Sequence, residues 1–298
     1  MRPIRILCKH RCAFMVSVRL VPILVLLLVG TVEAFSLLPL DTQDAVPLPS
    51  GKVEIHLGTE YLNHFRPIFR DFERRDQLSA PHLDVNVGAG SRVEIQFRYE
   101  LLYARDQTRD GSGTFSKYGS GDSRFFTKVR IFSAGEFDRP WVPAAAFHFG
   151  VKLPDANFLD HLGTDQTDFF GQFLLSKEVF GGLLLANLGS ALLGNPGPTR
   201  GQDDLFLYKV AAVTPEIGRW ARARLVLLGE VTGSEGSHFD NARRGVFLGN
   251  NRHDLRAGLQ LGSEFLEGYV GASAGLDSHS ENFGVRAGIL WRFQAFSD

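Results

Sequence analysis

Apolar and polar residues alternate along much of this chain with a period of two. In the stretch RVEIQFRYEL (92–101), apolar or aromatic residues take every second position, and charged or amide residues lie between them. The same alternation occurs at 52–60 and 253–261. This period is typical of β-strands with one apolar and one polar face, and no convincing amphipathic helix follows Lys52.

We expect twelve such strands, and the connections between them alternate between long and short. The strands are 52–63, 82–88, 92–103, 123–134, 141–153, 167–177, 179–190, 203–213, 219–231, 253–262, 265–275 and 283–293. Long loops are 64–81, 104–122, 154–166, 191–202, 232–252 and 276–282, and short turns are 89–91, 135–140, near 178, 214–218 and 263–264. This pattern predicts an all-β fold, a closed antiparallel transmembrane up-and-down β-barrel of about 12 strands with short periplasmic turns and longer external loops.

In such a barrel the apolar face of each strand meets lipid, and the polar face lines a lumen. Strands of about nine to eleven residues match a tilted bilayer crossing. The tryptophans give a second test, because Trp141, Trp220 and Trp291 all fall at the predicted periplasmic rim. With Phe293, they are the predicted membrane-interface aromatics, as expected for the aromatic belt of a barrel.

The N-terminus has the pattern of an export signal. A basic lead precedes the apolar run LVPILVLLLV (20–29), and Val32 and Ala34 are small residues suited to a cleavage site. We therefore predict a cleaved signal peptide at 1–34, with Met15 as an alternative start, then an extended periplasmic lead at 35–50 and a barrel at 51–298. Both cysteines, Cys8 and Cys12, precede the cut, which leaves no disulfide or cysteine chemistry in the mature chain.

Net charge of −1 over 298 residues argues against nucleic acid as a partner. The polar faces of the strands nevertheless carry many charged residues. The predicted lumen-lining residues are Glu54, His56, Glu60, Asp84, Glu94, Arg98, Glu100, Lys128, Arg130, His148, Lys152, Asp168, Lys209, Arg222, Arg224, Glu230, Asp254, Arg256, Glu267 and Arg286, together with Arg292. Acidic and basic groups nearly balance, so cross-strand ion pairs are favoured over a ring of one sign. A selectivity role for the Lys128/Arg130 and Arg222/Arg224 pairs is the alternative.

Residues for catalysis are sparse. Ser278-His279-Ser280 and Ser237-His238 lie in predicted external loops without a partner we can place, and Asn86 cannot serve as an acid beside Asp84. His148 is expected to be a lumen histidine rather than a catalytic one. The runs RDFERRD (70–76) and GTDQTD (163–168) are interpreted as loop charges. No His/Asp/Glu cluster has metal-ligand spacing, no nucleotide-binding motif is present, and no cofactor is expected.

Three stretches carry a resemblance to a known family: GSGDSRFFTKVRIF (119–132), AFHFGVKLPDAN (146–157) and LGTDQTDFFGQFLLSKEVFGGLLLANLGSALLG (162–194). They resemble outer-membrane proteins of the phenol-degradation MetA-pathway type, although Asp155-Ala156 replaces the Thr-Gly of that pattern. PLPSGKVEIHLGTEYLNHF (47–65) resembles a related, functionally uncharacterised outer-membrane family. These are turn and strand motifs. They identify no reaction, and what the resemblance implies is an outer-membrane barrel that passes small hydrophobic or aromatic compounds.

Three functions follow as hypotheses. The first is a passage for small molecules through the outer membrane of a Gram-negative bacterium. The second is a barrel without transport that serves the envelope structurally or presents its loops, and the third is an outer-membrane hydrolase. The expected partners are outer-membrane lipid, a small solute and the barrel-insertion machinery, because the strand ending at Phe293 resembles an insertion signal. The solute, the oligomeric state and whether the lumen is plugged stay open.

Overall fold

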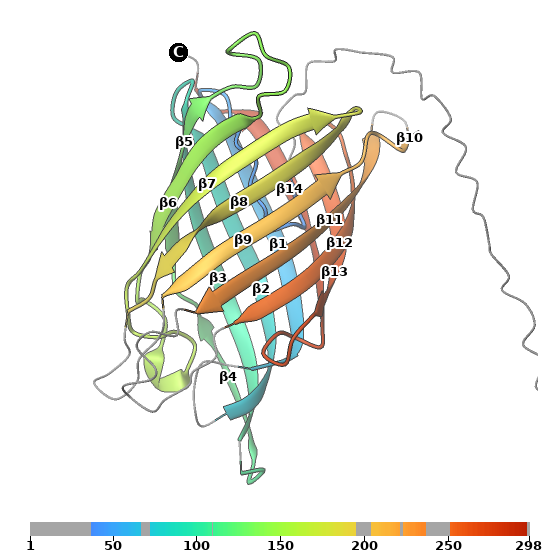
Figure 1. Cartoon of the computed structure of the whole chain (residues 1–298). Helices are drawn as coiled ribbons and strands as arrows, with labels where there is room; N and C mark the ends of the chain where they lie inside the picture. The colour runs from blue at the N-terminus through green and yellow to red at the C-terminus, as the bar shows by residue number, and fades with distance from the viewer. Residues whose placement is uncertain are drawn as a thin grey trace, which may run out of the picture.

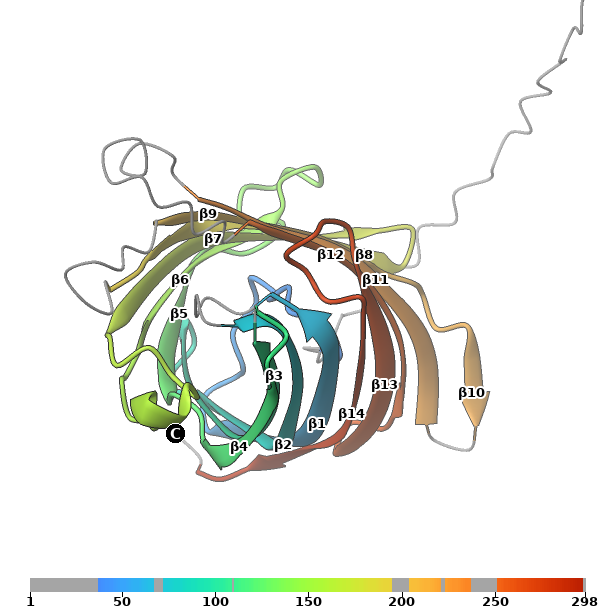
Figure 2. The same cartoon turned by 90° about the horizontal axis from the view of Figure 1, so that it is seen from below.

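The computed structural model describes residues 37–66, 72–108, 110–194, 204–220, 223–236 and 251–296, and they form one antiparallel sheet that closes on itself (Figures 1 and 2). The strands are β1 Lys52–Phe65, β2 Phe72–Gly88, β3 Val93–Thr108, β4 Thr114–Ser120, β5 Arg124–Phe132, β6 Ala144–Lys152, β7 Asp168–Val179, β8 Gly182–Leu192, β9 Leu205–Val213, β10 Gly218–Trp220, β11 Ala223–Gly236, β12 Arg252–Gly262, β13 Leu266–Gly275 and β14 Phe283–Gln294. A short 3-10 helix, η1, spans Phe158–Asp160.

Twelve of these strands form the ring. β1 pairs with β14, and β11 pairs with both β9 and β12, which closes the circuit. β4 pairs with β3, and β10 pairs with β11, so these two extend the rims. The prediction of a closed antiparallel barrel of twelve strands is therefore confirmed. Among the described residues, no helix has the length and apolarity needed to cross a membrane.

The two faces of the strands have opposite chemistry. On β3, the side chain of Ile95 is 48% exposed on the outside, whereas Gln96 is 1% exposed on the inside. On β14, Trp291 is 53% exposed and its neighbour Arg292 is 7% exposed. Apolar groups outside and polar groups inside are the reverse of a water-soluble protein and typical of a barrel that crosses a bilayer.

The short connections gather at one end of the barrel, which we call the short-turn end (top of Figure 1). The β7–β8 turn consists of Phe180 and Gly181, both with positive φ, which suits a two-residue hairpin turn. Trp141, Trp220 and Trp291 lie at this end, in the β5–β6 connection, in β10 and near the end of β14, and are 70%, 76% and 53% exposed. The ring of Phe293 lies 4.7 Å from that of Trp291.

The opposite, long-loop end contains more regular structure than the sequence predicted. The predicted loop 64–81 is largely strand, because β2 begins at Phe72, and the predicted loop 104–122 contains the β3–β4 hairpin. Interpreting RDFERRD as loop charges was wrong from residue 72 onward. Arg75 is buried on β2, and its Nε lies 2.6 Å from Oδ1 of Asp106 on β3. From the sequence alone this run resembles a solvated loop, because the partner of Arg75, Asp106, lies on the neighbouring strand.

Two strands start later than predicted at the short-turn end. The strand predicted at 141–153 begins at Ala144, so Trp141 precedes it. The segment predicted as one strand at 219–231 is divided into β10 and β11. Trp141 precedes β6, and Trp220 lies on β10, which pairs with β11 as a short hairpin beyond the twelve-strand ring.

Candidate functional site: the plugged lumen

Residues 37–50 lie inside the barrel, where they cross the lumen in Figure 2. The sequence alone predicted an extended periplasmic lead at 35–50, and the described part of this segment packs against the inner wall of the barrel. Leu37 packs near the start of β8 and β11, and Gly51 donates a backbone hydrogen bond to Gly88 beside the β2–β3 turn. Both ends of the segment thus lie toward the short-turn end, and its middle reaches deeper. We call residues 37–50 the plug.

One side of the plug is apolar. Leu37 and Leu40 form a buried cluster with four residues of the wall, namely Leu185, Ala211, Val226 and Leu228 from β8, β9 and β11. Ala45 packs in a second buried cluster with Ala144, Ala146 and Leu174 of β6 and β7. These apolar patches face inward in an otherwise polar lumen, so they constitute a seat for the leucines and the alanine of the plug.

The other side of the plug is anchored by charge. Oδ2 of Asp41 lies 2.7 Å from Nη1 of Arg256, and its Oδ1 accepts a 2.9 Å hydrogen bond from Nη1 of Arg286. Thr42 donates to Glu230 from both its backbone N–H (2.9 Å) and its Oγ1 (2.6 Å). These five residues come from the plug, β11, β12 and β14. Because buried charges are stable only when paired, the network determines the position of the plug's middle.

Backbone groups of the plug are also satisfied by the wall. The backbone N–H of Gln43 donates to Oδ1 of Asn187 (2.7 Å), whose Nδ2 donates to the carbonyl of Gln43 (2.9 Å). The N–H of Leu48 donates to Glu94 (2.8 Å), and Lys209 donates to the carbonyl of Asp41 (3.1 Å). The plug has no regular secondary structure, so these wall side chains supply hydrogen bonds that its buried backbone groups require.

Two glycines make room for the plug. A Cβ atom at Gly258 or at Gly271 would lie 2.4 Å from Cγ of Pro39. Gly258 and Gly271 are paired in register on β12 and β13. Their missing side chains form a shallow seat for the proline ring, which lets the plug approach the wall closely.

Most other predicted lumen residues form ion pairs with each other. Arg292 contacts Glu54 and lies 2.5 Å from Glu267, while Glu60 accepts from Arg286 (2.8 Å). Lys128 lies 3.1 Å from Glu94, and Lys152 lies 2.6 Å from Asp168. The remaining residues are placed as follows: Arg98 beside Asp84, Glu100 beside Arg124, Asp254 on the inner face of β12 with Arg256, Arg130 and Arg224 at the short-turn mouth, and Arg222 outside the described residues.

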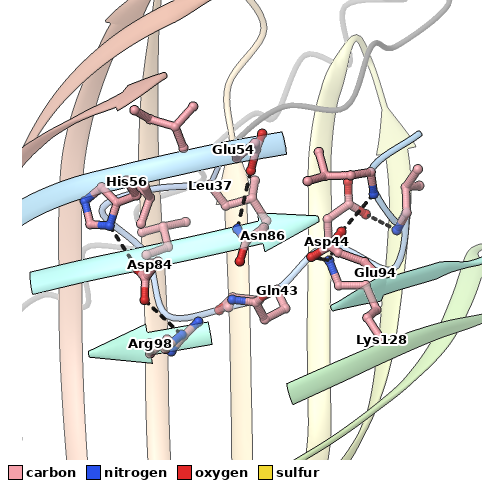
Figure 3. Close-up of a pocket in the computed structure, with 16 residues that line it drawn as sticks. Leu37, Gln43, Asp44, Glu54, His56, Asp84, Asn86, Glu94, Arg98 and Lys128 are labelled. Atoms are coloured by element: carbon pink, nitrogen blue, oxygen red, sulfur yellow. Dashed lines mark hydrogen bonds and ion pairs between the residues drawn. The ribbon is translucent and has the colours of Figure 1, made fainter. Parts of the chain in front are cut away.

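The lumen beside the plug is narrow. Two cavities of about 80 and 40 Å³ remain between the plug and β1, β2 and β3, and both are lined by His56, Asp84 and Arg98. Figure 3 shows these three side chains as a chain of contacts, with Nδ1 of His56 2.9 Å from Asp84 Oδ2 and Nε of Arg98 3.3 Å from Asp84 Oδ1. These two spaces have room for a few water molecules. A wider space of about 430 Å³ lies at the short-turn mouth, between the plug residues Val46 and Pro47 and the wall residue Arg292.

The histidines considered for catalysis have other contacts. His148 lies 3.1 Å from Gln96 and stacks on Phe126. Ser280 Oγ donates to the backbone carbonyl of His253 rather than to an imidazole. Burial lowers the pKa of His279, and the guanidinium of Arg66 adds to this effect. Within the described ranges these contacts give no nucleophile–base pair, and Ser237-His238 lies outside them.

Sequence reasoning missed the plug residues and one histidine. Leu38 to Val46 has no period, so its fit is visible only once the barrel wall is present. His82 shares the inner face of β2 with Asp84, and Asp84 is the register partner of His56 on β1. The spacing His82-Leu83-Asp84 on an alternating strand is the signal that places both side chains on one face.

No model of a known family matches the sequence, and no curated protein matches it. Solved structures do match. An outer-membrane channel from Pseudomonas putida F1 superposes with a TM-score of 0.61 at 13% identity, over 85% of this chain and 100% of that one. The translocator domain of the autotransporter NalP from Neisseria meningitidis gives 0.49 at 12% identity, over 83% and 90%. The fold is thus that of an outer-membrane β-barrel, and the family resemblance seen in the sequence is confirmed at the level of the fold.

Proposed function

We propose that the protein is an outer-membrane channel for small solutes whose resting state is closed by the plug. This proposal rests on the way in which the plug is attached. The plug is bound to the wall by side-chain contacts and contributes no strand to the ring. Since its two ends lie toward the same end of the barrel, it can withdraw while every pair of strands stays intact.

The walls that withdrawal would uncover favour small amphipathic solutes. One side carries Leu185, Val226 and Leu228, and the other carries Arg256, Arg286 and Glu60. An aromatic ring with one ionised or hydroxyl group matches such a pair of walls. This class agrees with the hydrophobic or aromatic compounds implied by the family resemblance, and the P. putida protein of similar fold is itself described as a channel.

The location and partners belong to the same proposal. We infer export through the signal peptide at 1–34 and insertion into the outer membrane by barrel-insertion machinery. Exposed apolar side chains on the outer face support contact with lipid, for example Ile95 and Val270, each 48% exposed. The short-turn end, with its tryptophans, then faces the periplasm.

A second candidate is a barrel that never opens. The pairing of Asp41, Thr42 and Glu230 favours it, because a polar network with its groups satisfied stabilises one position of the plug. The third hypothesis, an outer-membrane hydrolase, has no such support, because the described residues form no nucleophile–base pair.

A disulfide lock separates the open and closed hypotheses. Ala45 and Ala146 are both fully buried in one cluster, so a disulfide between cysteines at these two positions would hold the plug against the wall. We expect solute flux into liposomes and planar-bilayer conductance for the native protein. Oxidised Ala45→Cys/Ala146→Cys protein should show neither, and reductant should restore both. The single variant Ala45→Cys is the control. Flux that persists through the oxidised lock contradicts gating by the plug, and no flux from the native protein contradicts the channel.

A further inference from the structure

Three potential metal ligands meet on the inner face of β1 and β2. His56, His82 and Asp84 each offer one ligand atom, and these atoms lie within 4.8 Å of one another. The strands bring them together, since His56 pairs in register with Asp84, and His82 lies two residues before Asp84 on the same face. The cluster lies beside the plug and lines the smaller of the two cavities.

The separations suit a small four-coordinate cation. Nδ1 of His56 lies 2.9 Å from Asp84 Oδ2, and Nε2 of His82 lies 3.3 Å from Asp84 Oδ1. Zinc ligands at about 2.0–2.2 Å in a tetrahedron are separated from each other by roughly 3.3–3.6 Å. The two histidines contact different oxygens of Asp84, and the three ligand atoms lie within 4.8 Å of one another. Side-chain shifts of about 1 Å would therefore place all three around one ion.

A supporting contact orients His56. Its Nε2 lies 2.5 Å from the hydroxyl of Tyr269 on β13. When Nε2–H donates to that hydroxyl oxygen, the lone pair of the imidazole is on Nδ1, the atom that faces Asp84 and His82. Metal-binding histidines commonly have such an outer partner for the second ring nitrogen. The adjoining cavity of about 40 Å³ has room for one water molecule as a fourth ligand.

Two arginine side chains face the cluster, and their positive charge limits its affinity for a metal ion. Nε of Arg98 lies 3.3 Å from Asp84 Oδ1, and Arg286 lines the same cavity. A bound ion would share Asp84 with Arg98 or displace it. Arg286 is already paired with Glu60 and Asp41, so its charge is largely balanced. The side chain of His82 is 17% exposed, which leaves a route for an ion from the lumen.

We propose that His56, His82 and Asp84 bind one divalent transition-metal ion, with Zn²⁺ as the preferred class, beside the plug. Two imidazoles and one carboxylate are a donor set suited to zinc, copper and nickel rather than to magnesium or calcium. Tyr269 is the positioning residue for His56. The proposal is independent of transport, because an ion can bind to a barrel that never opens.

The test uses the full-length protein in detergent, stripped with a chelator and titrated with Zn²⁺ against a chromophoric competitor. We expect one equivalent to bind, and Co²⁺ should give the visible absorption of a four-coordinate ion. Loss of an outer partner weakens metal binding by about 10- to 100-fold, so Tyr269→Phe should fall in that range. His82→Gln removes a direct ligand and should weaken binding by at least about 100-fold.

The matched control is His253→Gln. His253 lies at the long-loop end, with its ring nitrogens 2.7 Å from Asp277 and 2.9 Å from Glu235, so it is a histidine between two carboxylates outside the proposed site. The His253→Gln variant should still bind one equivalent of Zn²⁺. Absence of stoichiometric binding by the native protein, or unchanged binding by His82→Gln, overturns the proposal. Heat-modifiable gel migration verifies folding, and should His82→Gln not fold, the Tyr269→Phe affinity and the native Co²⁺ spectrum decide.

Discussion

The two sides of the lumen hold the same plug by different physical means. On the side of β8, β9 and β11, Leu37 and Leu40 rest on aliphatic side chains. On the side of β12 and β14, Asp41 is held between Arg256 and Arg286. Apolar contact is non-directional and tolerates sliding, whereas paired charges require one arrangement. The comparison indicates that the leucines supply affinity for the wall and the aspartate determines the register of the plug.

The difference also bears on how a closed channel can open. Movement of the plug along the aliphatic side loses contact gradually. Movement away from the arginines separates ion pairs in one step, unless water or an anionic solute replaces the carboxylate of Asp41. A solute with an apolar body and a carboxylate could therefore compete on both sides at once. This argument supports the amphipathic class proposed above and predicts unequal effects of mutations on the two sides.

The largest effect is expected for Asp41→Ala. Arg256 and Arg286 are 7% and 13% exposed, and removing the carboxylate that they share leaves positive charge in excess. Asp41 itself is 32% exposed and Glu60 stays beside both arginines, so we expect the lower end of the range for a buried pair, about 3 kcal/mol. Docking of the plug should weaken accordingly, and amide exchange of residues 37–50, followed by mass spectrometry, should accelerate by more than 100-fold, since each 1.4 kcal/mol is about tenfold. Asp44→Asn is the control, because within the described ranges the carboxylate of Asp44 accepts a single hydrogen bond, the local one from the backbone N–H of Val46. If residues 37–50 exchange equally fast in both variants, Asp41 does not determine the position of the plug.

A smaller effect is expected for Leu40→Ala on the apolar side. Leu40 is 3% exposed, and truncation of a buried leucine costs about 2–5 kcal/mol in a rigid core. The plug can shift to refill the space, so we expect the lower end, about 2 kcal/mol, in the same exchange measurement. Val46→Ala is the control, because Val46 is 37% exposed. If Leu40→Ala releases the plug more than Asp41→Ala does, the assignment of roles to the two sides is reversed.

The sequence predicts the barrel well and the plug poorly, for one physical reason. A strand of the ring repeats its chemistry every second residue, so Ile95, Gln96 and Phe97 reveal their faces without knowledge of any neighbour. The plug has no repeat, and the roles of Asp41 and Thr42 depend on Arg256 and Glu230, about 190 or more residues away. The same limit concealed the pairing of Arg75 with Asp106 and the meeting of His56 with His82.

The smallest effect is expected for Gly271→Ala, which tests how closely the plug fits. The added Cβ would lie 2.4 Å from Cγ of Pro39 and 3.1 Å from the carbonyl oxygen of Ala257. Overpacking of this kind costs about 1–3 kcal/mol, and a mobile plug relieves it by shifting, so we expect about 1 kcal/mol and roughly a fivefold acceleration of exchange in residues 37–50.

Gly268→Ala is the matched control for that variant, since it lies on the same strand and its Cβ would approach no atom closer than 3.9 Å. The distribution of the effect separates two explanations. Exchange that accelerates only in residues 37–50 means that the plug gives way while the wall stays fixed. Exchange that accelerates equally in β12 and β13 means that the wall yields instead. In that case the glycines serve the strand pairing rather than the seat of Pro39, and the plug is held more firmly than the wall contacts of Asp41 and Leu40 alone require.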